Sequence, residues 1–187
     1  FKQKTAYEIR LSLVGSEMCI RDRNISPLKE GEIHLWAIAF NTNSPVFEAC
    51  KACLTNQERD RISYYSFKRV QDDYIMSQGG LRLLLSQYLK IEPQNIQLRK
   101  HSKGKPFTED DRGLCFNLSN TGDYVIYAFS RAGEVGIDLE EIRTLPDIDE
   151  LIEKNFTEKE RQYINKQKTE RFFQFKTYTR TCTNSTI

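Results

Sequence analysis

The sequence lacks the features that mark several classes of protein. No apolar run approaches the ~18–20 residues needed to span a bilayer, so a membrane protein is not expected. The 28 basic and 26 acidic residues leave a formal net charge of +2, which gives neither a nucleic-acid footprint nor a polybasic membrane signal. A local basic cluster for a phosphorylated ligand stays open.

Cysteine is scarce and odd in number. Five cysteines lie scattered in a 187-residue chain that is long enough to bury a core as one domain or two small lobes, which is typical of reduced thiols in a cytoplasmic protein. Cys50 and Cys53 form a C-x-x-C pair. A structural zinc site would need a second ligand pair, and His34 and His101 are isolated, so we expect buried thiols. A zinc module is kept as an alternative.

The most informative stretch is residues 133–141, G-E-V-G-I-D-L-E-E. A turn glycine precedes an alternating run, which predicts a strand with Asp138 and Glu140 on one face. Two adjacent carboxylates repel each other unless a cation or a shared proton lies between them. Mg²⁺ commonly binds one or two carboxylates together with substrate phosphates. The alternative is a strand end that enters an acidic loop.

Two further stretches suit a phosphorylated ligand. Residues 99–106 hold four lysines or arginines and end in G-K-P, where Lys105 offers the compact charge of a phosphate-binding lysine. Residues 119–123 predict a turn rich in hydroxyl and amide groups, which lets backbone N–H groups approach a phosphate. A nucleic-acid or interaction module on the basic stretch is a competing interpretation, against which the near-neutral charge argues.

Three motifs, taken in order and with their spacing, carry a resemblance. G-K-P at 104–106, F-N-L-S-N-T-G at 116–122 and V-G-I-D-L-E at 135–140 resemble those of the 4′-phosphopantetheinyl transferases, in particular the surfactin-synthetase-activating type. The resemblance covers roughly residues 30–175. It implies an α+β fold, in which an antiparallel sheet packs against a long helix, and a second similar lobe with the active site between the two.

The resemblance implies Mg²⁺-dependent transfer of the 4′-phosphopantetheine arm of coenzyme A to a serine of an acyl or peptidyl carrier protein. It places Arg61, Lys105, Ser119 and Asn120 around the 3′-phosphate end of the coenzyme, and no nucleic acid or membrane is implied as a partner. Homologues usually carry His where this chain has Asn120, so we expect weaker binding of the 3′-phosphate.

The same resemblance makes Asp138 and Glu140 the Mg²⁺ ligands. It also shows a departure at Glu58, which stands where the family has a basic residue.

Both ends of the chain depart from the family. Residues 1–23 resemble translated sequencing-adapter read-through, and we expect them to be poorly attached to the fold. The family-like lobe is expected over residues 24–144, the start of a second lobe over 145–175, and a non-family tail over 176–187.

The family's W-[ST]-x-K-E helix, which supplies a catalytic Glu and Lys, is replaced here by residues 176–180, K-T-Y-T-R. A frameshift or truncation after Phe175 explains this change. No catalytic residue is therefore assigned, and the alternative function is a coenzyme-A-binding but catalytically incomplete chain.

Periodicity and capping signals predict the remaining elements. Thr55 and Glu58 form a capping box, as do Thr157 and Glu160. Strands are expected at 32–40, 95–98, 114–118 and 124–130, and helices at 46–54, from 55 to about 65, at 67–90, at 146–155 and from 157 onward.

Overall fold

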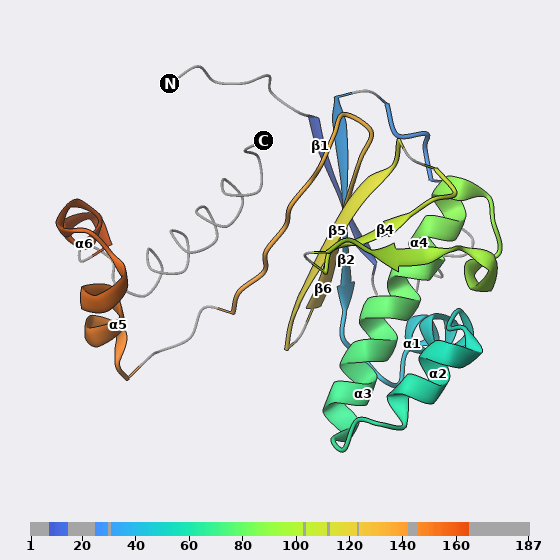
Figure 1. Ribbon diagram of the computed structural model, residues 1–187, viewed down its shortest axis with the longest axis horizontal. Helices are drawn as coiled ribbons and strands as arrows, with labels where there is room; N and C mark the ends of the chain where they lie inside the picture. The colour runs from blue at the N-terminus through green and yellow to red at the C-terminus, as the bar shows by residue number, and fades with distance from the viewer. Residues whose placement is uncertain are drawn as a thin grey trace. The chain divides into compact units, whose positions relative to one another are not determined.

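The computed structural model describes residues 8–14, 25–29, 31–102, 104–111, 113–122, 124–141 and 146–164. The chain divides into two compact units, Phe1–Ile137 and Asp138–Ile187. The second unit contains helices α5 (Ile148–Asn155) and α6 (Glu158–Ile164) (Figure 1). They pack through Ile152 and Ile164. These helices confirm the elements predicted there. Residues 165–187, and with them the replacement for the W-[ST]-x-K-E helix, lie outside the described residues.

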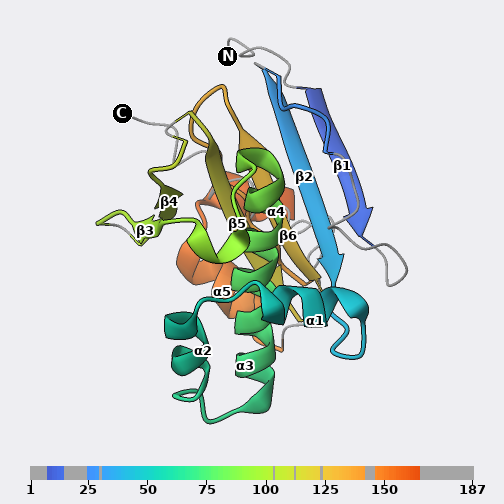
Figure 2. The ribbon, with the colours of Figure 1, turned by 90° about the vertical axis from the view of Figure 1, so that its right-hand side faces the viewer.

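A four-stranded sheet in the order β1-β2-β6-β5 forms the base of the first unit (Figure 2). The β2–β6 and β6–β5 pairs are antiparallel, whereas β1 and β2 are parallel. Two short strands make a separate antiparallel hairpin, the β3–β4 hairpin. The strands are β1 (Glu8–Val14), β2 (Glu32–Ala39), β3 (Leu98–Lys100), β4 (Pro106–Thr108), β5 (Cys115–Thr121) and β6 (Tyr124–Ser130). The α+β fold of the sequence prediction is confirmed.

Helices cover one face of this sheet (Figures 1 and 2). They are α1 (Pro45–Ala52), α2 (Asn56–Ile62), α3 (Lys68–Tyr74), the π-helical turn η2 (Ile75–Gly79), α4 (Gly80–Leu89) and the short 3₁₀ turn η3 (Pro93–Asn95). The run α3-η2-α4 confirms the long helix predicted at 67–90. Within the described ranges, no helix combines the length and apolarity that crossing a bilayer requires.

The π-helical turn and the residue after it bring the long helix close to both α1 and the sheet. Tyr127 of β6 is fully buried, and its hydroxyl donates a hydrogen bond of 2.6 Å to the carbonyl of Met76. A Cβ on Gly80 would lie 2.2 Å from the Tyr127 hydroxyl, and one on Gly79 would lie 2.1 Å from the carbonyl oxygen of Cys50. Two adjacent glycines therefore let the helix approach both α1 and the sheet. The sequence pattern did not predict this irregular turn.

Further along the helix, Tyr88 ties α4 to β2. Its hydroxyl lies 2.8 Å from Nδ1 of His34 and accepts a 2.9 Å hydrogen bond from Nε1 of Trp36. Its ring centroid lies 4.6 Å from that of Phe129 on β6. His34 is thus a buried, hydrogen-bonded core residue. Burial raises the pKa of Tyr88 well above its ordinary value.

Residues 134–140 do not form the predicted strand. The prediction rested on local alternation, but pairing depends on which sheet edges are available. Both edges of β6 are taken, one by β2 and the other by β5. The chain that leaves β6 therefore cannot add a strand beside it.

Three smaller predictions were also wrong. Residues 8–14 were expected to be loosely attached, yet they form β1, which pairs along its length with β2. A strand was predicted at 95–98, whereas the strand there is β3 and follows η3. The polar turn was predicted to begin at Ser119, but β5 continues through Thr121, because Ser119 and Asn120 pair with Ile126 and Val125.

The guanidinium of Arg82 joins α4 to two other segments from a buried position. The residue is 4% exposed, and Nε donates a 2.7 Å hydrogen bond to Oε2 of Glu58 on α2. Nη1 donates to the carbonyls of Pro93, at 2.7 Å, and Ile96, at 3.0 Å. Its charge is thus paired and its donors reach acceptors, the conditions under which a buried arginine is tolerated.

Glu58 serves two purposes at once. The capping box predicted from the sequence is present: the Glu58 amide donates to Thr55 Oγ1, and Glu58 Oε2 accepts from the Thr55 amide. The same Oε2 accepts from Arg82. Helix α2 contains no fully buried residue, so this ion pair attaches α2 to the core together with the packing of Ile62.

Replacing Arg82 by Met is expected to lower the free energy of unfolding by about 3–5 kcal/mol, because Glu58 and two carbonyls lose their partner in a buried place. Denaturant unfolding monitored by circular dichroism measures the change. Arg99→Met is the matched control, because Arg99 pairs with Glu109 at 3.3 Å with both side chains about half exposed or more. The control should cost less than about 1 kcal/mol. Equal losses in the two variants would contradict the role given to Arg82.

Candidate functional site

Lys105 lies in the turn of the β3–β4 hairpin. Its ammonium donates a hydrogen bond of 3.0 Å to the carbonyl of Val135 and pairs with Oε2 of Glu134 at 3.3 Å. The turn is closed by a 2.9 Å bond from the His101 amide to the Lys105 carbonyl, and the His101 ring stacks on Phe107. These contacts fix the lysine beside a hollow of about 350 Å³. We name it the hairpin hollow; Lys105, Pro106, Glu109, Phe116 and Glu134 are among its lining residues.

A larger cleft of about 730 Å³ lies beside the hairpin, between α2, α3 and β3. We name it the α2–β3 cleft. Its walls carry three cations, Arg61, Arg99 and Lys100, and three tyrosines, Tyr64, Tyr65 and Tyr74. Cations with exposed aromatic rings suit a ligand that has both phosphate and a flat base. Pro106 lines both this cleft and the hairpin hollow, so the two are neighbours.

Two tyrosines orient Arg61. Its guanidinium carbon lies 5.8 Å from the ring centroid of Tyr74, within cation–π range, and a hydrogen bond with Tyr65 raises the pKa of Arg61 above its ordinary value. Burial raises the pKa of Tyr74, which keeps that phenol neutral. Arg61 is therefore a permanent charge at the surface of the cleft. The coenzyme-binding role that the resemblance implies for Arg61 stays a prediction.

Glu58 also lines the α2–β3 cleft, but its carboxylate is engaged by Arg82 and by the capping box. The departure noted in the sequence thus has a structural reason. A lysine in place of Glu58 would leave the buried Arg82 guanidinium without its carboxylate partner.

Ser119 and Asn120 both lie on β5, near the end of the strand. Neighbouring residues on a strand point to opposite faces, so the two side chains do not act from the same side. Asn120 is exposed and shares its face with Leu118, which packs on the core, whereas Ser119 is half-buried on the other face. Neither Ser119 nor Asn120 is among the described residues that line the hairpin hollow and the α2–β3 cleft. Arg61 and Lys105 thus line two adjoining hollows, whereas Ser119 and Asn120 line neither of them.

A further cation lies at the end of the β5–β6 hairpin. Arg69 of α3 donates a hydrogen bond to the carbonyl of Gly122, two residues after Asn120. Its guanidinium carbon lies 4.2 Å from the ring centroid of Phe40. Sequence reasoning missed Arg69, because the contact joins residues 53 positions apart and leaves no local signal.

Asp138 and Glu140 belong to the second unit and follow the first unit directly in the chain. Both are half-buried, and their backbone is not part of a sheet. Within the described ranges, no three His, Cys, Asp or Glu side chains gather as a metal cluster. Two carboxylates nevertheless fit Mg²⁺, which takes only oxygen ligands and commonly completes its shell with water and substrate phosphates.

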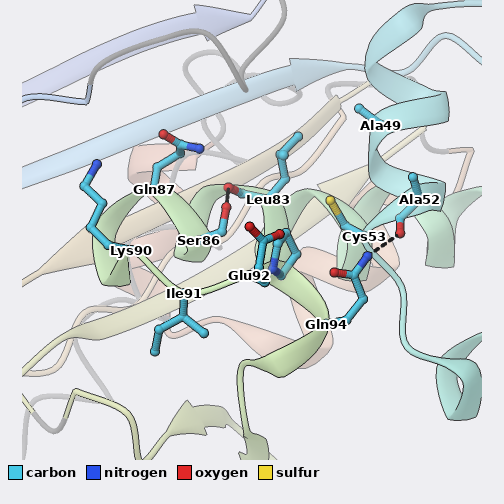
Figure 3. A pocket seen from close by; sticks show the side chains of 11 residues that line it. Ala49, Ala52, Cys53, Leu83, Ser86, Gln87, Lys90, Ile91, Glu92 and Gln94 are labelled. Carbon is cyan, nitrogen blue, oxygen red and sulfur yellow. Dashed lines mark hydrogen bonds between the residues drawn. The ribbon is translucent and has the colours of Figure 1, made fainter.

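A third hollow, of about 390 Å³, lies between α1, α4 and η3 (Figure 3). Two of its polar side chains are bonded to the backbone: Ser86 donates to the carbonyl of Leu83 and Gln94 to that of Ala52. Lys90 is the single cation among its described lining residues, so it does not resemble a phosphate site.

Cys53 lines this third hollow, and Cys50 is fully buried beside it in the core. Burial, together with Cys53, raises the pKa of Cys50 to about 12. At neutral pH this residue is therefore a thiol.

Comparison with known proteins points in one direction. Residues 39–132, half of the chain, match the family described as 4′-phosphopantetheinyl transferase, N-terminal. The chain is 29% identical over 155 residues to 4′-phosphopantetheinyl transferase HetI of Nostoc sp.. The aligned region covers 79% of this chain and 65% of that protein. The chain is also 29% identical over 118 residues to the L-aminoadipate-semialdehyde dehydrogenase-phosphopantetheinyl transferase of Rattus norvegicus, covering 58% of this chain and 38% of that enzyme.

The chain therefore spans less than two thirds of the length of these relatives. The matched region contains the sheet strands β5 and β6, the helices α1 to α4 and the β3–β4 hairpin with Lys105. On the strength of this match, the chain belongs to the 4′-phosphopantetheinyl transferase family.

Proposed function

We propose that this chain binds coenzyme A and forms part of an enzyme that transfers the 4′-phosphopantetheine arm to a serine of an acyl or peptidyl carrier protein in the cytoplasm. The observation that carries the proposal is the placement of Lys105. This lysine lies within the family-matched region, is held by the hairpin, and faces a hollow that adjoins a cleft lined by three more cations.

In this proposal the nucleotide end of coenzyme A is bound by the first unit. Lys105 supplies a point charge for the 3′-phosphate, and Arg61 supplies a forked donor that suits phosphate oxygens. Tyr65 and Tyr74 offer aromatic surface beside Arg61. Ser119 and Asn120 are the further proposed contacts on β5. Because they lie on opposite faces of the strand, one phosphate would meet only one of the two side chains, and Asn120 would bind it without positive charge.

The reaction transfers a phosphoryl-linked arm. The carrier serine oxygen forms a bond to the β-phosphorus of coenzyme A, the bond from that phosphorus to the bridging oxygen breaks, and adenosine 3′,5′-bisphosphate leaves with the electron pair. The serine proton goes to a general base, for which no described residue is proposed. Positioning of the pyrophosphate and neutralisation of its charge are the main contributions that a protein makes to such a step.

Asp138 and Glu140 are the residues proposed to hold Mg²⁺. When bound, the ion would neutralise charge on the pyrophosphate and orient it. A chain that binds coenzyme A without transferring its arm is the second candidate, favoured by K-T-Y-T-R at 176–180 in place of the family's W-[ST]-x-K-E. Mass gain of an apo carrier protein, incubated with coenzyme A and Mg²⁺, separates the two candidates.

Asp138→Ala is expected to weaken coenzyme A binding about tenfold in Mg²⁺ and to change it little in EDTA, because only the metal-bound state uses the carboxylate. Titration calorimetry under both conditions measures the effect. Glu141→Ala, an exposed carboxylate close by in the chain, is the control and should change neither value. Equal losses with and without Mg²⁺ would remove the metal role from Asp138.

Asn120→His is expected to favour coenzyme A over 3′-dephospho-coenzyme A near pH 6, where a histidine is largely protonated. A well-formed charge-assisted bond is worth roughly 1.5–3 kcal/mol, so the affinity ratio should rise about tenfold or more. Near pH 8 the imidazole is neutral and most of the gain should vanish. If the ratio is the same in both proteins at pH 6, Asn120 does not lie at the 3′-phosphate.

A further inference from the structure

Glu134 already occupies one side of the Lys105 ammonium. The two charged groups are 3.3 Å apart, while the Val135 carbonyl takes a second ammonium hydrogen at 3.0 Å. An ammonium group has three N–H donors, so one is left for another partner. The place beside Lys105 that a phosphate would take is thus shared with a carboxylate of the chain itself.

The exposure of the two partners differs. The Lys105 side chain is 26% exposed, whereas that of Glu134 is 71% exposed. The Glu134 carboxylate is exposed to solvent. It directly follows Gly133, whose φ of +131° is a conformation that L side chains rarely adopt. Glu134 can therefore swing into solvent at little cost, while the bond to Val135 keeps the lysine in place.

Charge decides which anion Lys105 prefers. A phosphate monoester carries about −1.5 to −2 at pH 7, against −1 for a carboxylate, and it offers three acceptor oxygens. The two anions repel each other if both stay beside one ammonium. Glu109, the other acidic residue of the hairpin hollow, is paired with Arg99 and does not share Lys105 in this way.

We infer that Glu134 holds the place of a ligand phosphate on Lys105 and is displaced when that phosphate binds, so that Glu134 lowers the affinity of the chain for phosphorylated ligands. This inference rests on the proposed function, because it takes coenzyme A as the ligand at Lys105. It goes beyond that function by naming Glu134 as a residue that lowers the affinity for coenzyme A. Exposed ion pairs are weak, so the effect is a few-fold change.

The experiment compares wild type, Glu134→Gln and Glu109→Gln by titration calorimetry on the full chain. Both variants remove one negative charge from the hairpin hollow, but Glu134→Gln frees Lys105, whereas Glu109→Gln frees Arg99 of the α2–β3 cleft. Coenzyme A is the ligand, and pantetheine, which has no phosphate, is the control ligand. We expect Glu134→Gln to bind coenzyme A about two- to fivefold more tightly at low salt, with a smaller gain at high salt. Glu109→Gln should gain less, and pantetheine should not distinguish the proteins.

The outcomes separate the inference from the proposed function. If wild type binds coenzyme A and Glu134→Gln binds it no more tightly, the inference is overturned and the proposed function stands. The inference is also overturned if both variants gain equally, because general charge then explains the effect. If neither wild type nor Glu134→Gln binds coenzyme A, both the proposed function and the inference fail.

Discussion

The buried guanidinium of Arg82 is the constraint on which the geometry of the α2–β3 cleft depends. It pairs with Glu58 and bonds to the carbonyls of Pro93 and Ile96, so it joins α2, α4 and the segment that leads into β3. Arg61 is carried by α2, and the hairpin starts two residues after Ile96. Arg82 therefore connects the segments that carry Arg61 and the β3–β4 hairpin.

The cations around the cleft are also restrained by contacts within the protein. Arg61 lies against Tyr74, Arg99 pairs with Glu109, and Lys105 pairs with Glu134. Exposed ion pairs contribute little to the stability of the fold. A dianionic ligand can therefore displace the carboxylates at a small cost in free energy. The restraints preorganise the side chains and at the same time lower the free energy available for binding. Glu134 is the clearest case, because it touches the lysine of the family motif.

Local signals in the sequence were enough for much of this structure. The capping box of Thr55 and Glu58, and the helical stripe that buries Leu81, Leu84 and Leu85, depend on residues close together in the chain. Contacts between residues far apart in the chain could not be predicted from the sequence. The strand predicted at 134–140 fails because β2 occupies the second edge of β6, and the Arg82–Glu58 pair joins residues 24 positions apart. Of the candidate site, the motif residues were identified from the sequence, but the engagement of Lys105 by Glu134 was not.

The central claim is that Lys105 recognises the 3′-phosphate of coenzyme A. The most direct measurement is a thermodynamic cycle: calorimetric affinities of wild type and Lys105→Met for coenzyme A and for 3′-dephospho-coenzyme A. We expect wild type to prefer coenzyme A by roughly tenfold or more and Lys105→Met to lose most of this preference. The coupling free energy between Lys105 and the 3′-phosphate should then be about 1.5–3 kcal/mol. A preference that survives the substitution unchanged would contradict the claim.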